Sequence, residues 1–389
     1  MICTNLVSKL HICSIRLVRR THCLTTKLNH RSIVSIEGED VVSFLQGLVT
    51  NDVRHFETSQ PLPAIYSLLL DQRGRVTNDL ILYALPLHKS SSEGNSCVSK
   101  ILCECDASTT TSLVKRLHIY KLRRKITIRD CSSIYDVHSV FPLYTASTSS
   151  SNATSVDLEP NIGDDSKLPS VAEINSSGVT VVARDPRIKT LGYRIISGTN
   201  IDQSLPIFGT NKPELVEIDR YWKYLKILGV GEGVQDFPPG KCTPLESNGD
   251  YLNGISFHKG CYVGQELTAR THHAGVVRKR LMPIVVTSPV SASLKEILPD
   301  SAVYLENDKP DEQHRASISP SGKKIGKFRS GCGPYGLALL RFENTISADG
   351  SASSLYVISP NGVKISLAAS KPWWWSDLEV RGFQPSSET

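Results

Sequence analysis

Two features of the sequence predict an α+β fold that ends in a small β-barrel. Between about residues 31 and 280, short strand patterns alternate with amphipathic helix patterns, and hairpin turns join several of the strands. This order favours lobes of split β-α-β type over a doubly wound sheet. After residue 280, six short strand patterns follow one another with turns between them, which is typical of a small barrel.

The first lobe is expected to cover residues 31–145. After Gly38, the spacing of the apolar residues predicts a helix with one buried face. A second helix is expected over residues 107–120, followed by a basic cluster at 121–125 that we interpret as a solvated face. Cys103 and Cys105 alternate on a strand and should share one packed face. The expected strands are residues 32–37, 65–70, 76–83, 100–105 and 126–128, with a hairpin turn at 71–74.

Residues 146–178 form an insertion rich in Ser, Asp, Asn and Pro. Such a segment cannot bury enough apolar surface to offset the entropy of ordering, so we expect a disordered surface loop. The second lobe should then cover residues 179–280. It opens with a strand at 179–183 and contains a helix over about 212–228.

The last region, residues 281–389, is expected to form the barrel. The three consecutive tryptophans at 373–375 should pack against it. The six expected strands are residues 281–286, 301–304, 324–328, 337–341, 355–358 and 363–367.

Residues 1–30 have the composition of a mitochondrial transit peptide. Lysine, arginine, serine and threonine are frequent, and the first acidic residue is Glu37. Cleavage is expected between about residues 20 and 30. The lysine and arginine that interrupt the apolar residues make a secretory signal a poorer match.

The overall composition narrows the possible functions. A chain of 389 residues should hold two or three domains. The net charge is +6, but much of it lies in the first thirty residues, so general nucleic-acid binding is not expected. The ten cysteines contain no C-x-x-C pair, which argues against a zinc finger or a thioredoxin-type site. No run of about eighteen apolar residues predicts membrane insertion.

One stretch places a cysteine in a setting that favours reactivity. Lys259 lies two residues before Cys261, and Gly260 and Gly264 allow tight turns around it. A short helix should begin at Gln265, because acidic Glu266 falls in its first turn, two histidines fall near its end and Gly275 follows. A thiol before a helix N-terminus and near a lysine should hold more thiolate, the form that attacks electrophiles and binds iron.

The same stretch carries a resemblance to a known family. Residues 259–266, Lys-Gly-Cys-Tyr-Val-Gly-Gln-Glu, match the signature K-G-C-[FY]-x-G-Q-E of the folate-binding, aminomethyltransferase-related proteins that help to mature iron–sulfur clusters. The chain looks like the mitochondrial branch of that family from about residue 30 to residue 375, interrupted by the insertion. Further matching segments are residues 185–187, 191–195, 233–240, 243–248, 271–278, 326–331 and 336–340.

The resemblance implies an aminomethyltransferase-like fold and a role in the mitochondrial matrix, in the maturation of [4Fe-4S] proteins. Cys261, with Lys259 beside it, would supply a thiolate ligand to a transient iron–sulfur cluster. One cysteine cannot hold such a cluster alone, so A-type scaffold proteins would share it as partners. The implied clients are aconitase-like and lipoate-synthesis enzymes, and the protein would not be an enzyme in the ordinary sense. His272 and His273 are candidate auxiliary ligands.

Two other functions remain open. The first is a tetrahydrofolate-dependent one-carbon transferase of the aminomethyl type. In the related transferases two acids occupy the positions of Asn78 and Asp79, and an amide at 78 cannot take a proton as a carboxylate can. Glu246 is a candidate pterin contact. The motif residues Tyr262, Gly264, Gln265 and Glu266 are further candidates for cofactor binding. The second is a structural adaptor in which Cys261 serves only folding.

Overall fold

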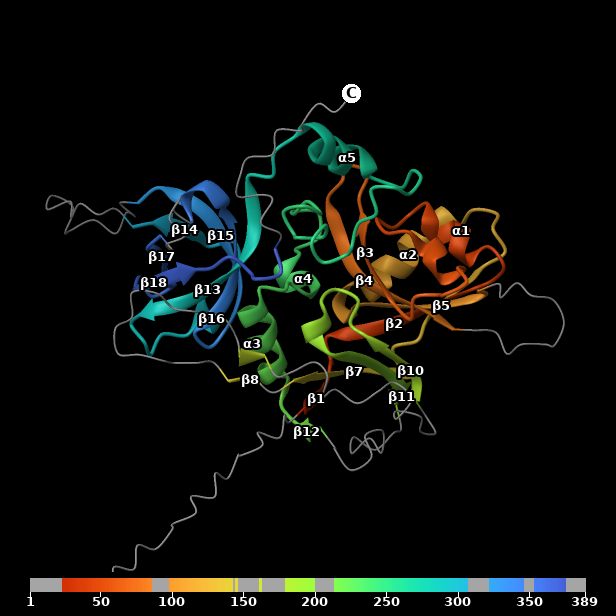
Figure 1. Cartoon of the computed structure of the whole chain (residues 1–389), viewed down its shortest axis with the longest axis horizontal. Coiled ribbons are helices and arrows are strands. Elements are labelled where there is room, and N and C mark those ends of the chain that lie inside the picture. The colour runs from red at the N-terminus through yellow and green to blue at the C-terminus, as the bar shows by residue number, and fades with distance from the viewer. Residues whose placement is uncertain are drawn as a thin grey trace, which may run out of the picture.

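The computed structural model describes residues 23–85, 98–142, 144–145, 161–162, 179–199, 213–306, 322–345 and 353–375. Within these ranges the chain forms two five-stranded sheets, a two-stranded sheet and a closed six-stranded barrel. Figure 1 shows the barrel on one side of the molecule and the two larger sheets on the other. The expected α+β class with a C-terminal barrel is therefore confirmed.

The first large sheet has the strand order β3-β4-β5-β2-β6. The expected hairpin is present, because β3 pairs with β4 in antiparallel register across the turn after Leu70. The predicted apolar face of the first helix, α1, is buried in the core of this lobe together with the apolar face of α2. The bounds are β2 Arg31–Glu37, α1 Val41–Gln46, β3 Ile65–Leu70, β4 Val76–Leu85, β5 Lys100–Asp106, α2 Thr110–Lys121 and β6 Thr127–Asp130.

The second large sheet has the order β10-β11-β7-β1-β12, and only β10 was predicted from the sequence, so four of its five strands were not. β7 belongs to the chain segment of the first lobe, yet it pairs with β11 of the second. β1 lies inside the range expected for the transit peptide, and it pairs along its whole length with β7. The second sheet therefore combines segments from both sides of the insertion, whereas all strands of the first sheet precede it. The bounds are β1 Cys23–Lys27, β7 Tyr135–Pro142, β10 Val179–Arg184, β11 Tyr193–Gly198 and β12 Glu214–Leu215.

Most of the expected insertion, residues 146–178, lies outside the described residues, as do residues 1–22 of the expected transit peptide. The exception in the insertion is β9, Asn161–Ile162, which pairs with β8, Tyr144–Thr145.

Two predictions around the third helix need correction. The helix α3 spans Ile218–Leu228 and begins later than expected, because Glu214 and Leu215 are extended and pair with β1 as strand β12. The Gly/Pro-rich loop after it contains a short helix, α4, Gly233–Asp236, where no helix was expected. The next helix, α5, spans Gln265–Ala274 and begins at the predicted residue.

The barrel closes in the order β13-β16-β15-β14-β17-β18, with β18 returning to β13. Trp375 is buried in the barrel core and the indole of Trp374 donates to the carbonyl of Leu228 at 2.8 Å, as the packing prediction required. Trp373, by contrast, is half exposed. The strands are β13 Lys279–Ser288, β14 Ala302–Leu305, β15 Lys324–Cys332, β16 Tyr335–Arg341, β17 Leu355–Ile358 and β18 Lys364–Ala369. Short 3-10 helices are η1 Val53–Phe56, η2 Ala107–Thr109, η5 Lys189–Leu191, η7 Leu294–Glu296 and η9 Phe342–Asn344.

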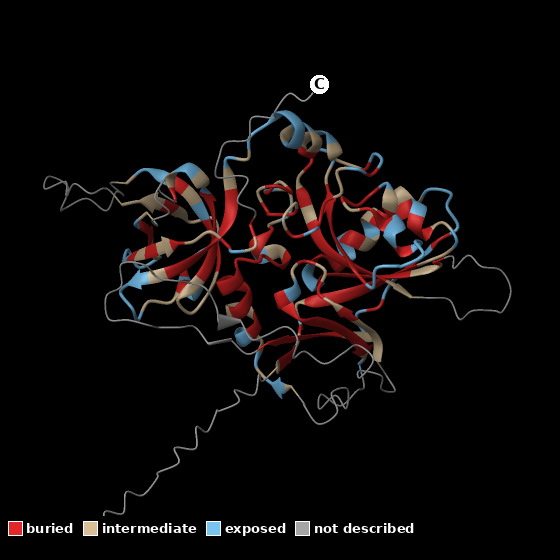
Figure 2. Ribbon diagram, viewed as in Figure 1, coloured by how far each residue is buried: buried red, intermediate tan, exposed pale blue. Residues whose placement is uncertain are grey.

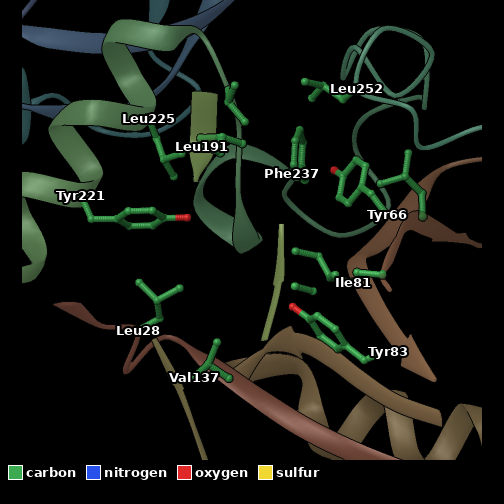
Figure 3. Packing of buried hydrophobic residues seen from close by; sticks show 14 of the residues in the cluster. Leu28, Tyr66, Ile81, Tyr83, Val137, Leu191, Tyr221, Leu225, Phe237 and Leu252 are labelled. Atoms are coloured by element: carbon green, nitrogen blue, oxygen red, sulfur yellow. The ribbon is translucent and has the colours of Figure 1, made fainter. Parts of the chain in front are cut away.

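One hydrophobic core joins the three parts of the molecule. Tyr66 and Tyr83 enter it from the first sheet, Tyr221 and Leu225 from α3, and Leu281 from the first barrel strand. Figure 3 shows the first four of these side chains converging on one region. This continuous core therefore packs the two sheets, α3 and the barrel against one another. Within the described residues, none of the helices has the length and apolar composition needed to cross a lipid bilayer.

Candidate functional site

Cys261 differs from the other described cysteines in its exposure. Of the seven described cysteines, all free thiols, it is the one that is exposed. Cys103 and Cys105 pack in the same core cluster, as their alternation predicts, and burial raises the pKa of Cys105 to about 12. Burial likewise raises the pKa of Cys242 to about 11. These buried thiols stay protonated at neutral pH, and Cys23 and Cys332 are partly buried, so Cys261 is the most accessible of the described thiols.

Lys259 is buried and holds the loop that carries Cys261. Its ammonium group donates to the backbone carbonyls of Gln46 at 2.8 Å, Val49 at 2.7 Å and Asn51 at 2.8 Å. These three contacts use all three N–H donors of a lysine. Burial lowers the pKa of Lys259 to about 8, while the carboxylate of Asp52 acts in the opposite direction. Lys259 is therefore positioned to anchor the loop to the end of α1, a role that the sequence did not predict.

Backbone hydrogen bonds extend the same attachment on both sides of Lys259. The N–H of Ser256 donates to the carbonyl of Thr50 at 3.0 Å, and that of Val263 donates to the carbonyl of Gly47 at 3.1 Å. The hydroxyl of Thr50 donates to the carbonyl of Gly254 at 2.6 Å. We call residues 46–51, which receive or make these bonds, the loop platform. The platform fixes the loop before and after Cys261.

Gly264 and Gln265 shape the end of the loop. Gly264 has φ +78°, and an added Cβ would come within 2.3 Å of the carbonyl oxygen of Asp71. Only glycine fits this close approach without strain. The side-chain oxygen of Gln265 accepts from the backbone N–H of Tyr262 at 3.2 Å. The backbone N–H of Gln265 donates to the carbonyl of Tyr262 at 3.3 Å. At Gly260, by contrast, an added Cβ would meet nothing within 4 Å.

The helix α5 has the predicted distribution of charged residues. Glu266 lies in its first turn, His272 and His273 lie in its last turn, and Gly275 follows. The ring of His272 stacks on Phe257 at a centroid distance of 3.6 Å. Burial and the neighbouring His273 lower the pKa of His272, which favours the neutral ring. Among the described residues, no group of three or more His, Cys, Asp or Glu side chains is arranged to hold a metal ion.

Asp79 lies in a different setting, the buried interior between the two large sheets. Its carboxylate pairs with the guanidinium of Arg31 at 3.0 Å, and Arg31 also donates to Glu104 at 2.8 Å. Asn78 donates its side-chain amide to the hydroxyl of Thr109 at 2.9 Å. Asp79 is therefore part of a charged network, in which a second arginine, Arg194, pairs with Glu104.

The charged network continues through Asp185, Arg187 and Arg194, which lie in the family-matching segments 185–187 and 191–195. Arg187 and Arg194 both donate to Asp185, at 2.7 and 3.1 Å, and both pair with the carboxylate of Glu232. Burial acts to raise the pKa of Glu232, but the two guanidinium groups lower it well below its usual value. The ring Nε2 of His30 donates to the carboxylate of Glu232 at 2.7 Å. Because buried charges need partners, the Asp-Pro-Arg segment and the later arginine form one unit.

Two polar atoms next to this network have no partner within the described residues. They are the hydroxyl of Tyr66 and one terminal nitrogen, Nη2, of Arg31, and a third atom, Nδ1 of His30 within the network, also has none. The guanidinium of Arg187 lies over the Tyr66 ring at 5.7 Å. Figure 3 shows the Tyr66 side chain directed into the interior between the sheets and α4. Buried polar groups usually carry hydrogen bonds, so these atoms are exceptions within the described residues.

The candidate residues are not gathered in one place. Tyr262 is buried in the central core, Glu266 is exposed on α5, and Asp79 lies in the charged interior. Glu246 lines a cavity against the barrel, where its carboxylate accepts from the hydroxyl of Thr243 at 3.2 Å. Cys261, Lys259, Gly264 and Gln265 do belong to one structural unit, because the loop and its platform join them.

Comparisons with known proteins agree with this architecture. Residues 278–377 match the family described as the CAF17, C-terminal beta-barrel domain. In structure, the chain is similar to the glycine cleavage system aminomethyltransferase T from Bartonella henselae, with a TM-score of 0.58 and 15% identity over 92% of this chain and 87% of that one. This likeness confirms the aminomethyltransferase-like fold.

Sequence relatives cover most of the chain. It is 35% identical to the iron-sulfur cluster assembly factor IBA57, mitochondrial, of Mus musculus, over 90% of this chain and 84% of the relative. The protein of the same name from Homo sapiens is 33% identical, with the same coverage of both chains. A homologue from Mycosarcoma maydis is also 33% identical, over 90% and 84%. At this identity and coverage, the chain belongs to the IBA57 family of iron–sulfur cluster assembly factors.

Proposed function

We propose that this protein acts in the mitochondrial matrix, in the maturation of [4Fe-4S] proteins, and that the thiolate of Cys261 binds an iron–sulfur cluster in transit. The observation that carries the proposal is the exposure of this one thiol on a loop that the platform holds in place. A soft thiolate ligand suits iron–sulfur clusters. The cluster is cargo here, passed on to clients such as aconitase-like and lipoate-synthesis enzymes.

The remaining cluster ligands would come from a partner. A cluster needs about four protein ligands. The described residues gather no set of three metal-ligating side chains, and His272 is stacked on Phe257. An A-type scaffold protein with its own cysteines fits this need, because both proteins could then ligate one cluster across their interface. His272 and His273 remain proposed auxiliary ligands.

A mitochondrial location is supported by two independent observations. The residues before the first acid, Glu37, are basic and contain many hydroxyl side chains. The relatives that match over most of the chain carry the word mitochondrial in their names. A transit peptide would end before the first strand of the fold.

Anaerobic mixing of the purified protein with a cluster-loaded A-type scaffold tests the proposal. Wild type should form a coloured complex that co-elutes on a sizing column, and Cys261→Ser should not. Cys332→Ser is the matched control, because that thiol is half-buried on the barrel and should leave the complex unchanged. Equal complex formation by wild type and Cys261→Ser would remove Cys261 from the ligand set.

A tetrahydrofolate link, or a one-carbon transferase activity of the aminomethyl type, is the second candidate. The unpartnered Tyr66 hydroxyl and Arg31 Nη2 beside Asp79 fit the polar edge of a pterin, and bound folate would supply a one-carbon unit. Against transfer, Asn78 has an amide where the transferases have an acid, and Asp79 is already paired. Titration with tetrahydrofolate should give saturable binding that Tyr66→Phe and Asp79→Asn both weaken. Absence of binding to wild type would leave the assembly role alone.

A further inference from the structure

A cavity of about 270 Å³ lies on the outside of the barrel, and none of its lining residues belongs to the Cys261 loop or to the charged interior. Barrel strands β13, β15 and β16 form one side of it. The other side comes from Arg75, after the β3–β4 turn, and from the loop that carries Lys241 and Glu246. Figure 1 shows these strands on the side of the barrel that faces the rest of the molecule. The cavity is thus built from two parts of the fold.

The charge of this cavity is strongly unbalanced. Seven of its lining side chains are lysines or arginines, and Glu246 is the one carboxylate among the described lining residues. Three of the cations, Lys241, Lys327 and Arg329, share the single carboxylate of Asp300. Partial burial acts to raise the pKa of Asp300, but the bond from Lys241 and these nearby charges lower it. One ionised carboxylate cannot neutralise three cations.

The other four cations have no acidic partner at all among the described residues. They are Arg75, Lys279, Lys324 and Arg341. Lys279 and Arg341 stand directly opposite each other on the antiparallel strands β13 and β16. Like charges at such a position repel and destabilise the pairing. The fold thus keeps an unfavourable pair at the edge of a cavity, where an anion could bind between the two side chains.

We propose that this cavity binds a small polyanion that carries two or more phosphate or carboxylate groups. Lysine and arginine side chains form strong charge-assisted hydrogen bonds with both groups, and arginine can bind them in a bidentate manner. At about 270 Å³ the cavity lies just below the usual range of about 300–1,000 Å³ for ligand pockets, so it suits only a small molecule. The charged lining excludes an apolar ligand. This binding is independent of the cluster chemistry proposed for Cys261.

Calorimetric titration of the full-length protein with tripolyphosphate and, separately, with citrate tests the proposal. Both titrations are run at physiological salt, which screens weak surface attraction. Saturable one-to-one binding of either probe is expected, and the tighter probe identifies phosphate or carboxylate as the preferred group. Lack of saturable binding of both probes would overturn the proposal.

Three variants separate a specific site from general attraction to a basic protein. The double variant Lys279→Gln/Arg341→Gln should weaken binding by ~10-fold or more, because two charge-assisted contacts are lost. Glu246→Gln should tighten binding a few-fold, because the opposing carboxylate is removed. A glutamine side-chain oxygen at position 246 can still accept from the Thr243 hydroxyl, and the backbone N–H of residue 246 can still donate to that hydroxyl. Misfolding cannot produce tighter binding, so this variant guards against a trivial result.

Lys364→Gln is the matched control, since it removes a positive charge from the barrel outside the cavity. It should bind as wild type does. Equal weakening by Lys364→Gln and by the double variant would show attraction to net charge and would overturn the site. Cys261→Ser should bind the polyanion normally, so failure of the cluster proposal and failure of this one are distinguishable.

Discussion

At the scale of single residues, the side chains of Lys259 and Cys261 in the same motif have different environments. The ammonium group of Lys259 lies among three backbone carbonyls, so its contribution is to the position of the loop. The Cys261 thiol is left exposed for chemistry. Within the motif, Lys259 therefore holds the loop in position, and Cys261 is the thiol left accessible.

Substitution of Lys259 should destabilise the fold, whereas substitution of Cys261 should leave its stability nearly unchanged. Lys259→Met should lower the free energy of unfolding by about 2–4 kcal/mol, because three carbonyls of the platform lose their donor. Cys261→Ser should change it by less than about 0.5 kcal/mol, since the side chain is exposed. Urea unfolding followed by circular dichroism measures both. If Lys259→Met were as stable as wild type, the anchoring role of Lys259 would be wrong.

The sequence singled out the cysteine that the structure shows to be exposed, but it did not reveal the partners of Lys259. The signature and the flanking glycines selected Cys261 out of ten cysteines. The carbonyls that bind Lys259 lie more than 200 residues earlier in the chain. Backbone carbonyls have no sequence signal of their own, so a lysine beside a thiol is naturally interpreted as a charge that activates the thiol.

At the scale of elements, the junction between the loop and α5 depends on Gly264. Its positive φ and its close approach to the carbonyl of Asp71 bring the start of α5 against the β3–β4 turn. A side chain here must move either the helix or the turn. The position of the exposed loop is therefore coupled to the first sheet.

Gly264→Ala and Gly260→Ala form a matched pair in one loop. Gly264→Ala should destabilise the fold by about 1–3 kcal/mol or more and weaken the scaffold complex, since the new Cβ meets backbone at 2.3 Å. Gly260→Ala should leave both unchanged, because its Cβ meets nothing within 4 Å. Thermal unfolding and complex formation measure the pair. Equal effects of the two changes would contradict the steric argument.

Elements with strong local patterns were predicted, and elements defined by distant partners were not. The six barrel strands and the β3–β4 hairpin follow from alternation and turns. β1 lies in a basic, hydroxyl-rich segment whose composition predicts a transit peptide. The start of α3 was also wrong, because pairing with β1 holds residues 214–215 extended. In both cases tertiary pairing overrides the local pattern.

At the scale of the whole molecule, β1 sets a limit on processing of the N-terminal segment. Leu24 and Leu28 are buried in the central core, and β1 pairs on both sides, with β7 and with β12. Removal of the first 22 residues leaves these contacts in place. Removal of 30 residues, the full range predicted for the transit peptide, would delete the strand.

A chain that begins at Cys23 should therefore unfold at the same urea concentration as the full-length protein. A chain that begins at Arg31 should lose at least about 3 kcal/mol, since burial of each leucine contributes about 1.5–3 kcal/mol. Mass spectrometry of the imported, mature protein should place its first residue at or before Cys23. A mature protein that starts at residue 31 with native stability would contradict the importance of β1.

The same strand has a consequence for the order of folding. Leu24 pairs with Glu214, so the sheet cannot be completed until most of the chain is available. Contacts between segments so distant carry a large loop-closure entropy and slow the folding rate. β1 precedes its pairing partners in the chain, so its backbone N–H and C=O groups stay unpaired until those partners have been synthesised. Unpaired strand edges favour aggregation. Productive folding should therefore depend on chaperones that bind this N-terminal segment until residues 214–215 are available for pairing.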